Sequence, residues 1–119
     1  MSTERAGPRD PESFLPLRPL VFSVLLLLKK EKLHGYSIMK KVNDNAGKRV
    51  ILGPGTLYRT LKEMRETGLV DHTDAPRGDT SDERRSYYAL TPLGRRVVRA
   101  EASRIGRLLQ DARLMPSES

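Results

Sequence analysis

Apolar positions cluster into segments that glycine and proline separate, and the first long cluster predicts a helix over residues 18–31. Its apolar side chains surround the helix axis instead of forming one stripe. A helix that is hydrophobic on most sides has to be covered on most sides. A domain of 119 residues cannot easily cover it alone, so this segment is the first indication of a partner subunit.

Two further helices are predicted between Gly35 and Gly68. Apolar residues at helical spacing indicate a short helix that begins after Gly35 and ends near Gly47. The sequence GPG at residues 53–55 opens a third helix, because proline suits the first helical position, where an N–H is not needed. Gly68 then supplies the left-handed residue that commonly ends a helix.

The C-terminal part predicts a hairpin followed by a long helix. Residues 69–73 and 86–90 have the β-branched and aromatic character of strands, and the polar stretch between them forms the hairpin tip. Thr91-Pro92 marks the start of a helix that runs to about residue 115. The helix would extend about 35 Å, longer than the domain can cover, so a two-fold related copy of the chain is the simplest partner for its apolar stripe. The expected fold class is mainly α with a small β hairpin.

Basic residues concentrate in the middle of the chain. Residues 29–62 contain nine lysines and arginines against two acidic residues, so this window alone accounts for the net charge of +7. Clustered cations gain by displacing the counterions of a polyanion, which predicts nucleic acid or an anionic membrane surface as a partner. A solvated basic surface is the other interpretation. The apolar segment at residues 20–28 is far shorter than the roughly 20 residues that span a bilayer, so no membrane span is expected.

Catalytic and metal-binding patterns are missing from the sequence. No glycine-rich phosphate loop, nucleophile elbow or HExxH motif occurs, so we expect neither an enzyme nor a cofactor. The two histidines, His34 and His72, lie far apart and there is no cysteine, which argues against a metal site. The absence of cysteine also fits the reducing cytoplasm, where we expect the protein to act.

The third predicted helix separates apolar from polar side chains. At about 100° per residue, Leu57, Leu61 and Met64 share one face and are expected in the core. The outward side chains are Thr56, Tyr58, Arg59 and Lys62. A helix that presents such groups after a short helix and a glycine turn meets the requirements of a major-groove reader, and its N-terminus suits a phosphate.

Three segments resemble those that mark a known protein family. LHGYSIMKKV, GPGTLYRTLKEMRETGLV and RRSYYALTPLGRRV are similar to the corresponding segments of the PadR family of bacterial transcriptional regulators. The resemblance covers roughly residues 17–100. It implies a winged helix-turn-helix in residues 14–91 and a C-terminal dimerisation helix in residues 92–115, as in the shorter branch of the family. It also implies a homodimer that binds a pseudo-palindromic operator in double-stranded DNA, usually to repress.

The resemblance further implies which residues lie at or near DNA. Arg59 is the best candidate for a bidentate contact to a guanine edge or a phosphate, and Tyr58 for a contact to phosphate or sugar. The full set is Tyr36, Ser37, Lys40, Gly55, Thr56, Tyr58, Arg59 and Lys62, with Arg77, Arg84 and Arg85 in the wing. Acidic residues also occupy the wing tip, so a winged-helix protein-interaction adaptor without sequence-specific DNA binding remains the alternative.

Two more sets of residues follow from the resemblance to the family. Those expected at the dimer interface are Leu20, Val24, Leu27, Val98, Ala102, Ile105, Leu108, Leu109 and Ala112. Relatives can enclose aromatic compounds at their dimer interface, which implies a small hydrophobic or aromatic effector. Its pocket, between the first and last helices, would be lined by Phe14, Phe22, Leu26, Leu108 and Met115, although these side chains could equally fill the space. Residues 1–13 and 116–119 are expected to be tails, the first of them flexible.

Overall fold

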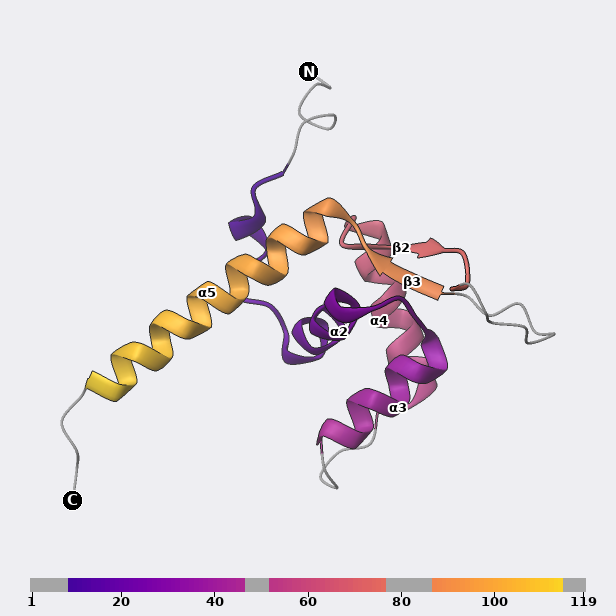
Figure 1. Cartoon of the computed structure of the whole chain (residues 1–119), viewed down its shortest axis with the longest axis horizontal. Helices are drawn as coiled ribbons and strands as arrows, with labels where there is room; N and C mark the ends of the chain where they lie inside the picture. The colour runs from indigo at the N-terminus through magenta and orange to yellow at the C-terminus, as the bar shows by residue number, and fades with distance from the viewer. Residues whose placement is uncertain (1–8, 47–51, 77–86, 115–119) are drawn as a thin grey trace.

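The computed structural model describes residues 9–46, 52–76 and 87–114 (Figure 1). Its elements in chain order are η1 (Pro11–Phe14, a 3-10 helix), α2 (Pro19–Lys30), β1 (Leu33–His34), α3 (Gly35–Ala46), α4 (Pro54–Glu66), β2 (Val70–Thr73), β3 (Tyr87–Leu90) and α5 (Pro92–Leu114). The mainly α fold class predicted from the sequence is confirmed. The predicted tails at residues 1–8 and 116–119 lie outside the described residues.

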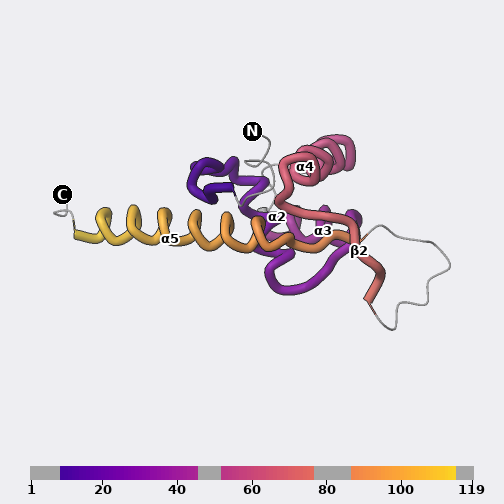
Figure 2. The backbone as a smooth tube through the Cα atoms, turned by 90° about the horizontal axis from the view of Figure 1, so that it is seen from above, coloured from indigo at the N-terminus to yellow at the C-terminus, as the bar shows by residue number. Residues whose placement is uncertain are grey.

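Helices α2, α3 and α4 gather around one core, and α5 runs past α2 as a long rod (Figure 1). Seen from above, the C-terminal half of α5 projects beyond the rest of the described chain (Figure 2). The most deeply buried apolar side chains are Val24, Leu25, Ile38, Leu57, Leu61, Met64, Val70, Val97 and Val98. Within the described segments, no helix combines the length and apolar character needed to cross a membrane.

The sheet has three antiparallel strands in the order β1–β3–β2. Strands β2 and β3 form the predicted hairpin, with Val70 opposite Leu90. The sequence pattern does not predict β1, because its two residues, Leu33 and His34, occur where the pattern indicates only a break between helices. Pairing of Leu33 with Tyr88 attaches the start of α3 to the hairpin.

Gly68 ends α4 as predicted, with a left-handed φ of 88°. The Leu69 N–H donates to the Met64 carbonyl at 2.9 Å, a bond characteristic of the Schellman motif. Thr91 is the predicted cap of α5, and its Oγ accepts a hydrogen bond from the Gly94 N–H at 3.0 Å. The same hydroxyl donates to the Gly68 carbonyl at 2.5 Å, so one threonine joins the end of α4 to the start of α5.

Gly94 allows the first turn of α5 to pack against the chain that leaves α4. A Cβ at this position would lie 3.1 Å from the carbonyl carbon of Leu69 and closer still to the carbonyl oxygen. Because the obstacle is backbone, it cannot rotate away as a side chain can. The close approach of α5 to the sheet therefore depends on glycine at this position.

The N-terminal arm, which we define as residues 9–18, corrects the predicted extent of the first tail. Its short helix η1 packs against α5. The Arg9 guanidinium lies 5.3 Å from the centre of the Phe14 ring and donates a hydrogen bond to the Thr67 carbonyl at the end of α4. From Arg9 onwards, the predicted tail of residues 1–13 therefore includes residues that contact α4 and α5.

Helix α2 is covered mostly by its own chain. Val24 and Leu25 are fully buried, and α3, α5 and β3 all pack against the helix. Leu26, at 40% exposed, is its main exposed apolar side chain in the described structure. Helix α3, the sheet and α5 thus supply much of the cover that the sequence pattern assigns to a partner subunit.

Candidate nucleic-acid interface

Helix α4 divides into a buried and an exposed face, as the sequence predicts. Leu57, Leu61 and Met64 are buried in the core, and Thr60 joins them at 4% exposed. The exposed positions on the remaining surface include Gly55, Thr56, Tyr58, Arg59 and Lys62. The helix therefore presents cationic and hydroxyl groups to solvent while its apolar face fixes its orientation.

Asn43, which no sequence pattern marks, anchors the start of α4. The Asn43 side-chain amide donates to the Leu52 carbonyl at 3.1 Å and accepts from the Leu52 N–H at 2.6 Å. This pair of bonds connects the last turn of α3 to the residue before the Gly53 cap of α4. Asn43 thus fixes the two helices of the helix-turn-helix relative to each other.

His34 caps the start of α3. Its Nδ1 accepts a hydrogen bond from the Ser37 N–H at 3.2 Å, and its Nε2 lies 3.0 Å from the Ser37 hydroxyl. The ring stacks on Tyr36 and meets Tyr87 edge-on, with centroids 6.4 and 5.3 Å apart. Of the predicted contact residues on α3, Tyr36 and Lys40 are exposed, whereas Ser37 is half-buried with its hydroxyl against His34.

Tyr58 reaches from α4 to the first residue of α3. Its ring covers Gly35, where a Cβ would lie only 2.6 Å from the ring carbon Cε1. Tyr88 of β3 is close enough for the Tyr58 hydroxyl to affect it electrostatically. Burial is the main cause that raises the pKa of Tyr88, Tyr58 raises it further and Arg65 lowers it. Through its contact with Gly35, Tyr58 therefore bridges helices α3 and α4.

The wing residues predicted to contact DNA, Arg77, Arg84 and Arg85, lie outside the described residues. Met115 of the predicted effector pocket does so too. At the described base of the wing, the His72 ring packs against Tyr88 with centroids 4.8 Å apart. This contact joins β2 to β3. Strand β1 pairs with the opposite edge of β3.

The residues predicted at the dimer interface fall into three groups: buried, half-buried and exposed. Val24 and Val98 are 0% and 2% exposed in a single chain, so their assignment to a dimer interface is wrong. Both belong to the chain's own core, because α2 and the first half of α5 pack against each other. Leu20 and Leu27 are half-buried. The exposed members all lie on the second half of α5: Ala102, Ile105, Leu108, Leu109 and Ala112.

The described residues of the predicted effector pocket lie apart in the single chain. Leu26 lines a small hollow next to Asn45, Phe14 lines a different one, and Leu108 is 54% exposed on α5. Phe22 is half-buried against the core. The reason is the course of α5, whose second half extends away from α2 (Figure 2).

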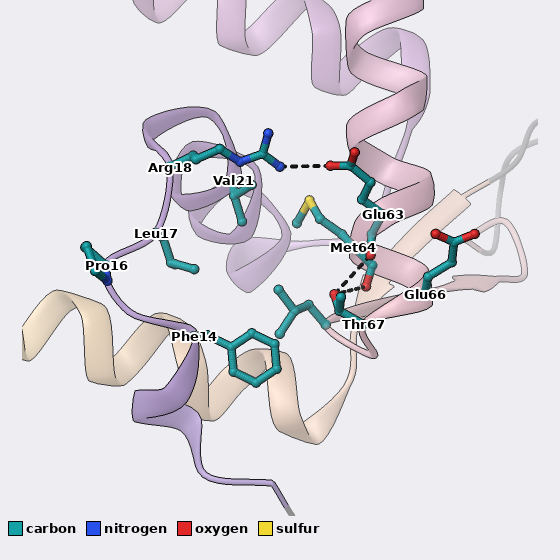
Figure 3. A pocket seen from close by; sticks show the side chains of 10 residues that line it. Phe14, Pro16, Leu17, Arg18, Val21, Glu63, Met64, Glu66 and Thr67 are labelled. Carbon is teal, nitrogen blue, oxygen red and sulfur yellow. Dashed lines mark hydrogen bonds and ion pairs between the residues drawn. The ribbon is translucent and has the colours of Figure 1, made fainter.

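A hollow of about 380 Å³ lies instead between the N-terminal arm and the end of α4 (Figure 3). We call it the arm pocket; it is lined by Phe14, Pro16, Leu17, Arg18, Val21, Glu63, Met64, Glu66, Thr67 and Leu69. Arg18 and Glu63 form an ion pair at 2.9 Å along one side of it. The floor is apolar, and the side chain of Glu66 points away from the hollow (Figure 3).

Glu101 connects the arm to α5. Its carboxylate is 1% exposed and accepts hydrogen bonds from the Leu17 N–H at 2.8 Å and from the Arg104 guanidinium at 2.6 and 3.1 Å. The hydrogen bonds from Arg104 are the main cause that lowers the pKa of Glu101; burial opposes them and the Leu17 N–H adds to them. The charged form of this buried carboxylate is therefore the stable one.

The sequence matches the transcriptional regulator PadR-like family over residues 24–100, which is more than half of the chain. The chain belongs to this family. The members of the PadR-like family are transcriptional regulators, so the expectation that the chain is not an enzyme is confirmed. The matched span includes α3, α4, the sheet and the start of α5. It therefore contains all the residues predicted to contact DNA.

Solved structures of PadR-like proteins have the same winged-helix fold. A PadR-like transcriptional regulator from Bacillus cereus superposes with a TM-score of 0.70 at 21% identity, covering 83% of this chain and 93% of that one. Bacillus subtilis PadR, solved in complex with operator DNA, superposes with a TM-score of 0.54 at 22% identity, covering 87% of this chain and 51% of that one.

A curated relative shares more sequence but is much longer. An uncharacterized 37.1 kDa protein in transposon TN4556 of Streptomyces fradiae is 35% identical over 85 residues, which cover 71% of this chain. The matched region is 22% of that protein, so the chain spans about a fifth of the relative's length.

Proposed function

We propose that this chain is a homodimeric DNA-binding repressor of the cytoplasm that reads a pseudo-palindromic operator. The observation that carries the proposal is the exposed face of α4, where Tyr58, Arg59 and Lys62 point to solvent from a helix whose other face is buried. Family membership adds that the scaffold is that of transcriptional regulators. In the similar structure of Bacillus subtilis PadR, the bound molecule is operator DNA.

The chemistry of α4 suits the major groove. Arg59 offers a planar fork of donors that matches the edge of a guanine or a phosphate, and Lys62 offers a point charge for a phosphate. Tyr36 and Lys40, exposed on α3, lie on the helix that crosses the DNA backbone in such motifs. The cationic window at residues 29–62 adds counterion release, which makes the affinity depend steeply on salt.

The second half of α5 supports the dimer in this proposal. Ile105, Leu108 and Leu109 are 38%, 54% and 49% exposed in the single chain. Full burial of an exposed leucine contributes about 1.5–3 kcal/mol, and these side chains are about half exposed, so each contributes about half that amount when a second copy packs on this strip. In the proposed dimer, two α4 helices that enter successive major grooves would lie about 34 Å apart.

The effector in this proposal binds in the arm pocket. Its volume of about 380 Å³ and its apolar floor of Phe14, Leu17 and Met64 suit a small hydrophobic or aromatic compound. The pocket touches α4 and the arm, so an occupant would change how α4 is held. A compound that shifts the NMR signals of Leu17 and Met64 should also lower operator affinity; unaltered affinity with the pocket filled would remove the effector from the proposal.

The test is fluorescence anisotropy with a duplex from the DNA beside the gene, across a salt series. We expect Arg59→Ala to weaken operator binding by about 1–3 kcal/mol and to relax preference at one base pair. Lys62→Ala should weaken binding to all duplexes and lower the salt slope by about one unit per contact.

The matched control is Arg113→Ala, which removes an exposed cation at the far end of α5. It should leave operator affinity unchanged. Specific binding that persists unaltered in both α4 variants would remove these residues from the interface. Equal affinity for operator and random duplex, together with co-purification of a partner protein, would favour the adaptor instead.

A further inference from the structure

Gly35 and Tyr58 come from different helices of the helix-turn-helix and touch each other. A Cβ added to Gly35 would lie 2.6 Å from Cε1 and 2.7 Å from Cζ of the Tyr58 ring, and closer still to its hydroxyl oxygen. Contacts this short essentially never occur for real Cβ atoms. Any residue other than glycine at this position therefore forces one of the two groups to move.

The group that moves is the tyrosine side chain. Gly35 is buried, and the chain around it is held by the pairing of β1 with β3 and by the His34 cap of α3. Tyr58, by contrast, is 46% exposed, so its ring can rotate into solvent. The clash lies at the far end of a flexible side chain and costs little to relieve. A methyl group at Gly35 would thus leave the fold intact and displace the ring.

We propose that Gly35 is a positioning residue for DNA recognition, because its missing side chain lets the Tyr58 ring lie across the start of α3. The ring then spans α3 and α4, and its hydroxyl lies beside Gly35 on the helix-turn-helix surface that also carries Arg59. A side chain ordered before binding loses less entropy when it docks. The expected effect on operator binding rests on the proposed function. The position of the Tyr58 ring next to Gly35 is a property of the free protein.

The test is a double-mutant cycle with Gly35→Ala, Tyr58→Ala and the combined variant. We expect Gly35→Ala and Tyr58→Ala each to weaken operator binding by about tenfold. The combined variant should bind no more weakly than Tyr58→Ala, because the added methyl group then meets no ring. Thermal unfolding should show that Gly35→Ala is folded with a melting temperature close to that of the parent chain.

The matched control is Gly106→Ala, since a Cβ at Gly106 would meet nothing within 4 Å and the residue lies on α5, outside helices α3 and α4. It should bind the operator as the parent chain does. Losses that add in the combined variant, or parent-like affinity of Gly35→Ala, would overturn the inference.

NMR without DNA separates this inference from the proposed function. In Gly35→Ala the ring signals of Tyr58 should move toward those of an exposed tyrosine. Unmoved ring signals would overturn the placement even if the operator binds. A moved ring in a chain that binds no operator would leave the placement standing and reject the function.

Discussion

Both halves of α5 carry apolar residues at helical spacing, but the first half is largely buried and the second half is largely exposed. In residues 92–101, Gly94, Val97, Val98 and Glu101 are buried against the chain's own core. In residues 102–114 every side chain is exposed except Arg104, which is half-buried. A periodic pattern tells which side of a helix avoids water, but not whether the same chain or another one covers it. The first half therefore contributes to the stability of one chain, whereas the second half is the part available for the proposed association.

The largest expected effect comes from placing a charge in each half. Val98→Asp should lower the free energy of unfolding by about 4 kcal/mol or more, because it buries a carboxylate among apolar side chains without a partner. Leu109→Asp should keep the fold and prevent dimerisation. Circular dichroism melts and light scattering after size exclusion would report the two effects. A parent chain with the mass of one chain at working concentration would refute the dimer.

A smaller difference in stability between the two halves is expected when a glycine in each is replaced by alanine. Gly94→Ala should destabilise the chain by about 2–3 kcal/mol, because its methyl group meets the Leu69 carbonyl. Gly106→Ala is the matched substitution, since a Cβ there meets nothing within 4 Å, and it should stabilise the helix by up to about 1 kcal/mol. Urea unfolding of both variants would measure the difference. Equal effects at the two positions would contradict the division of the helix.

The smallest effect depends on pH. Glu101→Gln removes the ion pair with Arg104 and should lower the free energy of unfolding by about 1–2 kcal/mol at pH 7. The pKa of Glu101 lies below its ordinary value of 4.5, so its contribution is complete above that pH and is lost as the pH falls through the lowered pKa. The two unfolding curves should therefore converge in acid. Asp111→Asn, in the exposed half, should change stability little at any pH.

Local signals explain what the sequence predicts well. The buried face of α4 follows from the spacing of Leu57, Leu61 and Met64, and its end follows from Gly68, because helix period and capping involve neighbours along the chain. The cap at Thr91 belongs to the same class. These features fix the orientation of α4, the helix proposed to read DNA. That orientation is the part of the site that the sequence predicts.

Contacts between distant segments explain what the sequence does not predict. Glu101 bonds to Leu17, 84 positions away, and nothing in either segment marks the pair. In the sequence, Gly35 indicates only a break between two helices. The structure shows that the Tyr58 ring covers this glycine. The misassignment of Val98 has the same origin, because only the packed structure shows that α2 covers it. Sequence patterns identified the polar face of the site but not the residues that hold it.

The threonine at the start of α5 has a mechanical consequence for the proposed dimer. Through Thr91, the end of the reading helix and the beginning of the rod are fastened to one another. A lever of about 35 Å that tilts by about 5° displaces its tip by about 3 Å. The crossing angle of the two rods would then set the separation of the reading helices, and with it the spacing of half-sites that one dimer can span.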